Sequence, residues 1–232
     1  MRRREFNQLI GAAIAAPALP VAYALDWSAL SQKDALKALK TSLEQGTIQA
    51  VSQLGVQGGF MANPKVQIPL PSALNRVAPL LRTFGQGPRL ESLHQTMNSA
   101  AEQAVPLAKP LLLKAVRAIS VTDAKGILAG GDTSVTDYFA KATRADLTAQ
   151  FLPRVRTAMA KVGVAQQYDA VLSKAKRFGL SRELGPDLET YVTDHALTAL
   201  FSTIGEQERA LRQNPVGASS QLLQKVFGAI KP

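Results

Sequence analysis

A long amphipathic stretch between residues 90 and 119 constrains the fold of this chain more than any other feature. Its apolar side chains recur every three or four positions, the spacing that places them on one face of an α-helix. These side chains are Leu90, Leu93, Met97, Ala101, Ala104, Ala108, Leu111, Ala115 and Ile119. Pro106 and Pro110 lie within the stretch, and each removes a backbone hydrogen bond and crowds the preceding turn. The pattern predicts a long, proline-kinked central helix that other helices surround.

The rest of the chain predicts further helices rather than strands. Of its 232 residues, 46% are hydrophobic but only 6% are aromatic, and a β-sandwich would need more aromatic and β-branched residues. Apolar residues at helical spacing recur to the end of the chain, and no internal repeat or long linker divides them. We expect residues 25–232 to form a single all-α domain, a helical bundle of about eight to ten helices.

The first 24 residues predict a signal peptide that is absent from the mature protein. Arg2–Arg4 form a charged start, an apolar run follows from Leu9 to Val21, and Ala22–Ala24 form a cleavage site. The run is shorter than the ~20 residues of a membrane-spanning helix, so we expect no transmembrane anchor in the mature chain. Arg3–Phe6 resemble the core of a twin-arginine export signal. We expect a bacterial periplasmic protein cleaved after Ala24, exported by the twin-arginine or the general secretory route.

Several classes of chemistry are excluded by residue content. The chain has no cysteine, which rules out disulfides, a thiol nucleophile and an iron–sulfur cluster. His94 and His195 are its two histidines, and neither has a second histidine nearby in sequence, so we predict no metal site. No dinucleotide-binding glycine pattern and no P-loop is present, and we predict no cofactor.

Charge is distributed unevenly along this basic chain, whose formal net charge is +10. Residues 141–182 hold nine basic and two acidic side chains, whereas residues 183–208 hold six acidic side chains and no basic one. In one interpretation the two segments pack together and their fields largely cancel. In the other, a cationic face binds anionic lipid or an acidic envelope component, and nucleic acid is not expected in the periplasm. That face would comprise Arg154, Arg156, Lys161, Lys174, Lys176 and Arg177.

Residues 55–71 form the longest irregular passage. Gly58-Gly59 and Asn63-Pro64 are turn signals, and Pro69 and Pro71 force an extended backbone that cannot join the interior of a sheet. The passage predicts either an apolar strap across the helices or a functional loop.

Asn98 and Glu102 are the polar residues of the central stretch that most need a partner. They are four positions apart and therefore share one face of the predicted helix. Small apolar residues flank Glu102, and a buried carboxylate must be paired or protonated. One interpretation is a polar latch, in which Glu102 pairs with a lysine, an arginine or a helix N-terminus. The other makes Glu102 a general base or a ligand-binding group.

A second group of polar candidates follows Gly130-Gly131. Asp132 or Thr133 is expected to cap a short helix, and Thr143 is expected to cap a separate helix that ends near Gly163. The residues that could bind a ligand are Asn98, Glu102, Asp132, Tyr138 and Arg144. Further along, Glu208, Arg209 and Arg212 predict charge pairing at the end of a helix. Catalytic residues remain unknown.

Short segments spread over nearly all of the mature chain match one known pattern. They are Leu30–Ala35, Gly59–Phe60, Asn63–Val66, Ile68–Pro71, Met97–Glu102, Asp123–Ala124, Ile127–Asp132, Thr136–Phe139, Tyr191–Thr193, Arg212–Pro215 and Leu222–Phe227. Together they resemble the bacterial domain of unknown function 4197 family. Ser99 and Ala140 depart from the family pattern, which has arginine at both positions. The resemblance implies an exported helical protein and assigns no activity.

The leading hypothesis from these observations is a non-catalytic binding or envelope-interaction protein. Its site would be either the cationic face or a groove beside Pro106 and Pro110. The alternative is an enzyme of the hydrolase or lyase type, with Glu102 and Asp132 as acid and base. A structural homo-oligomer is a third hypothesis, and it would require an exposed apolar patch.

Overall fold

The computed structural model describes residues 27–177 and 187–230, so the predicted signal peptide lies outside the described residues. The described residues form eight α-helices, two short 3₁₀ helices and no strand, which confirms the all-α helical bundle. The elements are η1 (Trp27–Ala29), α1 (Gln32–Leu54), α2 (Ser72–Thr83), α3 (Gly87–Ala118), α4 (Ala124–Leu128), α5 (Ser134–Lys161), α6 (Val164–Arg177), α7 (Leu188–Gln213), η2 (Pro215–Gly217) and α8 (Gln221–Ala229).

Helix α3 is the central element that the apolar stripe predicts. It contains 32 residues and runs unbroken through Pro106 and Pro110, both of which are exposed. The stripe from Leu90 to Ala108 is buried, and α3 packs against α1, α2, α5, α6 and α7. The apolar face of one helix therefore supplies the surface on which most of the others pack.

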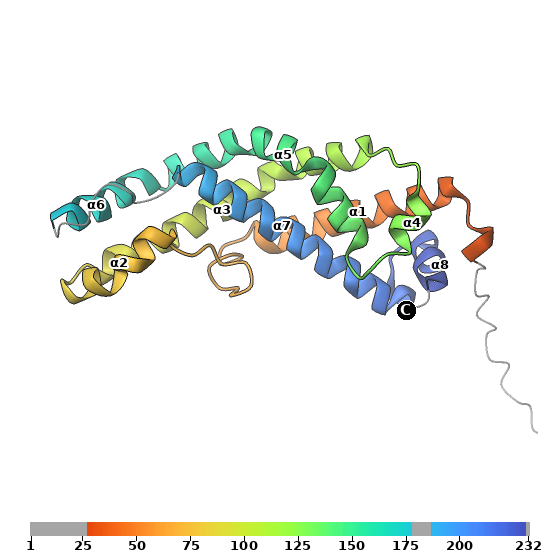
Figure 1. The fold of residues 1–232 in the computed structure, drawn as a ribbon, viewed down its shortest axis with the longest axis horizontal. Helices are drawn as coiled ribbons and strands as arrows, with labels where there is room; N and C mark the ends of the chain where they lie inside the picture. The colour runs from red at the N-terminus through yellow and green to blue at the C-terminus, as the bar shows by residue number, and fades with distance from the viewer. Residues whose placement is uncertain (1–26, 178–186, 231–232) are drawn as a thin grey trace, which may run out of the picture.

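The molecule is elongated, and its two ends are built from different helices (Figure 1). Helices α2 and α6 lie at one end, and α4, α8 and η1 lie at the other (Figure 1). Helices α3, α5 and α7 connect the two ends, and α1 packs closely against both α3 and α7. A Cβ atom on Gly46 of α1 would lie 3.1 Å from Ile204 Cγ2 of α7, so a glycine permits this close approach.

Helix α5 is one continuous helix where the sequence predicted two shorter ones, near residues 132–139 and 143–162. Its bounds are Ser134–Lys161, so the prediction of a break before Thr143 is wrong. The Thr143 hydroxyl donates a hydrogen bond to the Phe139 carbonyl, 2.6 Å away and one turn earlier. A threonine that bonds back in this way lies within a helix and does not start one. Figure 1 shows α5 changing direction along its length.

The segment 55–71 crosses the helices as an apolar strap. Phe60 and Ile68 are fully buried, and Leu70 is nearly so. Pro71 lies directly before the first residue of α2. Proline and the residue before it favour an extended backbone, so the strap stays extended until α2 begins. The strap therefore contributes core side chains although it has no helical structure of its own.

Candidate functional site

Asn98 of α3 holds the strap through its backbone. The side chain is fully buried. Its Oδ1 accepts a hydrogen bond from the Ile68 amide at 2.8 Å, and its Nδ2 donates to the Ile68 carbonyl at 2.9 Å. A third bond runs from Nδ2 to the His94 carbonyl at 2.8 Å. The amide group therefore satisfies both backbone polar groups of Ile68, which could not form a helical or sheet hydrogen bond there.

Glu102 holds the same strap one helical turn further along α3. Its Oε1 accepts hydrogen bonds from the backbone amides of Phe60, at 3.1 Å, and Met61, at 3.3 Å. The partner of this buried carboxylate is therefore loop backbone, and not the lysine, arginine or helix N-terminus that the sequence suggested. Two backbone donors therefore satisfy this buried carboxylate oxygen. From here on, the polar latch means Asn98, Glu102 and the backbone groups of Phe60, Met61 and Ile68 to which they are bonded.

Asp132 lies away from the polar latch. It is exposed, and its Oδ2 lies 3.6 Å from Arg209 Nε. Of the two residues predicted to cap α5, Thr133 occupies the N-cap position, but its side chain accepts no capping hydrogen bond. The first donors of α5 are taken instead by Glu208 of α7, which accepts from the Val135 amide at 3.1 Å and the Thr136 amide at 2.8 Å. A carboxylate from another helix thus replaces the local cap, because it reaches the free amides from the buried side.

Glu208 also forms a buried ion pair with Arg212. Their side chains are 3% and 10% exposed, and Arg212 Nη2 lies 2.8 Å from Glu208 Oε1. Arg212 donates further bonds to the Leu128 carbonyl and to the Ser134 hydroxyl, each at 2.9 Å. Its guanidinium lies 5.4 Å from the centre of the Phe227 ring. This Glu208–Arg212 cluster therefore joins α7 to α4, α5 and α8.

Sequence reasoning placed the Glu208–Arg212 pair at a helix end and missed its burial. The signal was available, because Glu208 follows Ile204 at a spacing of four and so continues the buried face of α7. A charged residue within an apolar stripe indicates a buried partner.

Tyr138 and Arg144 lie on different sides of α5. The Tyr138 hydroxyl donates to the Ser120 carbonyl at 3.3 Å and faces the end of α3. Arg144 faces α7, where its Nη2 donates to the Thr198 hydroxyl at 3.2 Å and its guanidinium lies 5.3 Å from the Phe201 ring centre. The five predicted ligand-binding residues therefore do not form one site. Asn98 and Glu102 lie together at the polar latch, whereas Asp132, Tyr138 and Arg144 contact other segments.

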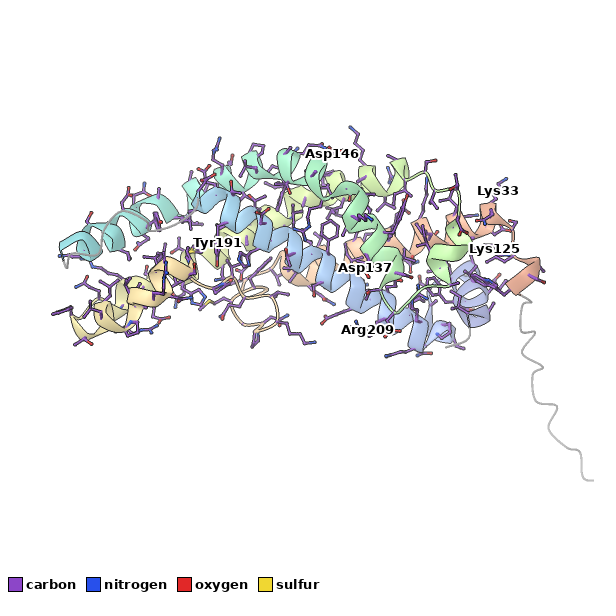
Figure 2. All side chains as sticks on the ribbon, in the orientation of Figure 1. Lys33, Lys125, Asp137, Asp146, Tyr191 and Arg209 are labelled. Atoms are coloured by element: carbon purple, nitrogen blue, oxygen red, sulfur yellow. The ribbon has the colours of Figure 1, made fainter. Side chains whose placement is uncertain are left out.

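The surface cavities lined by described residues include three that lie between helices. The α3–α5 groove encloses about 500 Å³ and is lined by Leu111, Lys114, Ala115, Ala118, Ile119, Ser120, Tyr138, Ala142, Thr143, Asp146, Leu147 and Gln150. The α5–α7 cleft encloses about 390 Å³, and Asp137, Arg144 and Arg209 are among the residues that line it. In Figure 2, Asp146 lies on the upper side of the molecule, and Asp137 and Arg209 lie on the lower side.

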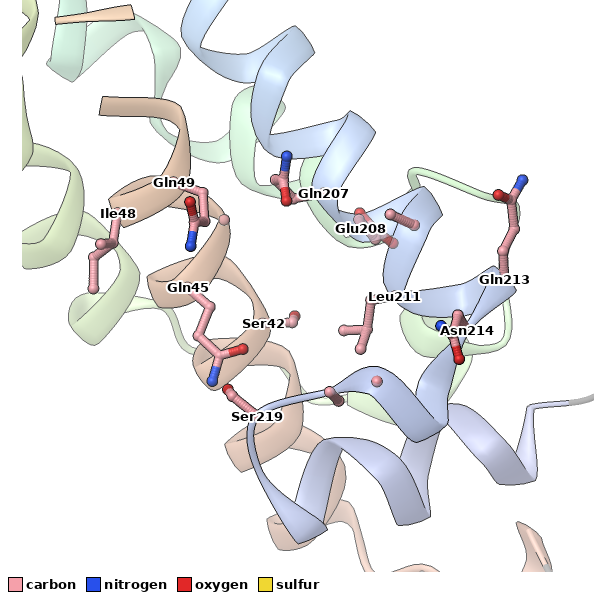
Figure 3. A pocket seen from close by; sticks show the side chains of 14 residues that line it. Ser42, Gln45, Ile48, Gln49, Gln207, Glu208, Leu211, Gln213, Asn214 and Ser219 are labelled. Atoms are coloured by element: carbon pink, nitrogen blue, oxygen red, sulfur yellow. The ribbon is translucent and has the colours of Figure 1, made fainter. Parts of the chain in front are cut away.

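The third cavity, between α1 and the end of α7, is the amide cleft. It encloses about 600 Å³ (Figure 3). Its amide side chains are Gln45, Gln49, Gln207, Gln213 and Asn214. Glu208 is the one charged residue in its lining, and the carboxylate of that residue is already bonded in the buried cluster. The lining therefore offers donors and acceptors but little net charge.

The sequence of the chain agrees with that of a known protein family. The sequence model of a family described as protein of unknown function (DUF4197) matches residues 29–228. The chain belongs to the DUF4197 family. Both the polar latch and the Glu208–Arg212 cluster of this DUF4197 chain lie within the matched residues. No curated protein and no solved structure matches the chain.

Of the six residues predicted to form a cationic face, two have partners within the described part of the chain. Arg156 of α5 pairs with Glu189 of α7 at 2.5 Å, and Arg154 donates to the Gln150 carbonyl. Lys161 is exposed and Lys174 is half-buried. The side chains of Lys176 and Arg177 lie outside the described residues. The Arg156–Glu189 pair shows α5 and the acidic start of α7 lying together, as the interpretation of cancelling charges requires.

Within residues 27–177 and 187–230, no three histidine, aspartate or glutamate side chains come together as metal ligands would. In the same residues, none of the helices combines the length and hydropathy needed to cross a bilayer.

His195 makes the stability of the folded chain depend on pH. Its ring packs on Tyr191, with 4.3 Å between the ring centres. Burial lowers the pKa of His195, and the nearby Asp194 offsets this effect only in part. The unfolded chain therefore binds a proton at this site more tightly than the folded chain does. The free energy of unfolding should fall as the pH drops from the ordinary histidine pKa of about 6.5 through the lowered value.

We expect the variant His195→Gln to reduce this pH dependence. Urea denaturation of the wild-type protein and the variant at about pH 7.5 and about pH 5 would measure the difference. The carboxylates contribute equally to the pH dependence of the two proteins, so the difference reports on His195. The wild-type protein should lose more stability between the two pH values than the variant. Equal losses in the two proteins would contradict the assignment to His195.

Proposed function

We propose that this protein is a non-catalytic binding protein of the bacterial cell envelope, exported to the periplasm, with the α3–α5 groove as its ligand site. The observation that carries the proposal is the make-up of this groove. It begins at Leu111, the residue after Pro110, where the sequence suggested a groove. Its walls are apolar side chains from two helices, including Ala115 and Leu147, and polar groups occur among them. Small-molecule sites commonly combine apolar walls with a few polar groups, in volumes of roughly 300–1,000 Å³.

The lining favours an amphipathic ligand with an apolar chain. Leu111, Ala115 and Leu147 would contact the chain, and Lys114 and Asp146 would contact a polar head group. Lys114 and Asp146 are both exposed and form no ion pair with another described residue. Their charges are therefore free to bind a head group that carries either sign or both.

The same structure gives less support to the enzyme hypothesis. Its two carboxylates would be Glu102 and Asp132. Glu102 is bonded to the strap, and Asp132 lies beside Arg209. Neither lines any of the three cavities described above. A general acid and base must reach the same substrate, and this pair does not share a site.

We expect the variant Ala142→Trp to weaken ligand binding at the groove at least about tenfold. Ala142 is exposed and lines the groove, so an indole there would occupy the space of the ligand. The variant Ala145→Trp is the matched control, because Ala145 is also exposed on α5 but lines none of the three cavities. Titration with a dansyl-labelled undecanoic acid, followed by fluorescence, measures the binding.

Native mass spectrometry of protein purified from the periplasm tests the natural ligand and the export together. We expect a chain that begins at Leu25 and carries an added mass released by organic solvent. A wild-type protein that neither carries a ligand nor binds the probe would overturn the groove proposal. Equal binding by the two tryptophan variants would place the probe elsewhere on the protein.

A further inference from the structure

The end of the molecule at the turn between α2 and α3 exposes two large apolar side chains side by side. Leu80 is 42% exposed and Phe84 is 49% exposed. They are four residues apart at the end of α2, so they lie on one face. The other large exposed apolar residues of the described chain are Ile48, Val56, Leu107 and Val216. Those four lie on separate elements, and single exposed apolar residues are ordinary on protein surfaces.

Positive charge surrounds this apolar pair. Arg76 lies four residues before Leu80 and is exposed on the same face of α2, and Arg89 is exposed just after the turn. Residues 72–96 contain three arginines and one acidic residue, Glu91, which gives a local charge of +2. Arg82 pairs with Glu91 at 3.2 Å, whereas Arg76 and Arg89 form no ion pair with another described residue. We call Arg76, Leu80, Phe84 and Arg89 the α2 tip.

The α2 tip lies at one end of the elongated molecule (Figure 1). The turn between α2 and α3 lies at one extremity of the long axis of the molecule (Figure 1). Gly85 has a φ of 72°, a left-handed conformation that lets the chain reverse tightly after Phe84. The apolar pair therefore lies at the end of the α2–α3 hairpin, at the end of the molecule that α6 also reaches (Figure 1).

We propose that the α2 tip binds the surface of an anionic lipid bilayer. Leu80 and Phe84 would enter the boundary between head groups and acyl chains, and Arg76 and Arg89 would pair with lipid phosphates. Short amphipathic helices with this combination lie in the plane of membrane interfaces. Charge complementarity favours a lipid surface over a second copy of this chain, because two copies would bring their arginines together. The surface differs from the α5–α6 region that the charge distribution first suggested.

The α2 tip and the α3–α5 groove can be tested separately, since the proposal does not depend on the groove. The tip ends at Arg89 in the first turn of α3, whereas the groove begins at Leu111 in the second half of that helix. The variant Ala142→Trp should therefore bind vesicles as the wild-type protein does.

Vesicle sedimentation tests the proposal directly. Vesicles of phosphatidylglycerol and phosphatidylethanolamine should bind the protein, and vesicles of phosphatidylcholine should not. The double variant Leu80→Ser, Phe84→Ser should bind about tenfold more weakly. The control is Val56→Ser, Val216→Ser, which removes apolar side chains that are 53% and 84% exposed elsewhere, and it should bind like the wild-type protein. The variant Arg76→Gln, Arg89→Gln should lose most of the salt dependence of binding.

A tryptophan at the tip reports its location. In a Trp27→Phe background, the emission of Phe84→Trp should shift to shorter wavelength with anionic vesicles and be quenched by brominated lipid. Trp27 of the wild-type protein lies in η1 at the opposite end and should show neither change (Figure 1).

Three outcomes would overturn the proposal. They are an absence of binding to anionic vesicles, equal loss of binding in the two double-serine variants, and binding to soluble polyglutamate that the Leu80→Ser, Phe84→Ser change leaves intact. The last outcome would assign the charges to an acidic polymer or protein.

Discussion

The variant Glu208→Ala is expected to lower the free energy of unfolding by about 3–5 kcal/mol, the usual cost of removing one member of a buried ion pair. The change leaves the Arg212 guanidinium buried without its carboxylate. It also frees the backbone amides of Val135 and Thr136 at the start of α5, which then have no acceptor from α7. Urea denaturation followed by far-ultraviolet circular dichroism would measure the loss.

Glu206→Ala is the matched control for this experiment. Glu206 lies on the same helix and pairs with Lys65 at 2.9 Å, but these two side chains are 42% and 75% exposed. Exposed ion pairs contribute about 0–1 kcal/mol, so the control should be nearly as stable as the wild-type protein. If Glu208→Ala were no more destabilising than Glu206→Ala, the Glu208–Arg212 cluster would not be a major source of stability.

The variant Asn98→Ala is expected to lower the free energy of unfolding by about 2–5 kcal/mol. It leaves the buried amide and carbonyl of Ile68 without partners, and each unsatisfied group costs about 1–3 kcal/mol. The strap should detach from α3 before the rest of the protein unfolds. Hydrogen exchange would show this as a loss of protection at the Ile68 amide that exceeds the loss at amides within α7.

Gln103→Ala provides the comparison for Asn98→Ala. Gln103 is exposed on the same helix, one residue beyond Glu102, and forms no side-chain hydrogen bond with the described residues. Its replacement should leave both the stability and the exchange at Ile68 nearly unchanged. Unchanged protection of Ile68 in Asn98→Ala would mean that the prolines and buried side chains hold the strap without the polar latch.

The polar latch and the Glu208–Arg212 cluster change how the polar residues of this chain are interpreted. Asn98, Glu102 and Glu208 are polar residues on the apolar faces of helices. Each forms hydrogen bonds with backbone groups of a segment that is distant in sequence. Glu102 reaches the strap across 42 residues of sequence, and Glu208 reaches α5 across 73. Their burial supports a structural role, and the proposed ligand and membrane contacts fall instead on the α3–α5 groove and the α2 tip.

The features that were predicted correctly are those that depend on the local spacing of residues. The three-and-four spacing of apolar residues from Leu90 onward predicted α3 and the all-α class, because one turn of an α-helix brings such residues to one face. The partners of the polar side chains depend on how the helices pack. Thr143 could either start a helix or lie within one, and Glu208 could pair with a charged neighbour at its own helix end or cap another helix. The outcome depends on which free backbone groups the packing of the helices and the strap brings within hydrogen-bonding distance. Residue spacing along the chain does not predict these distances.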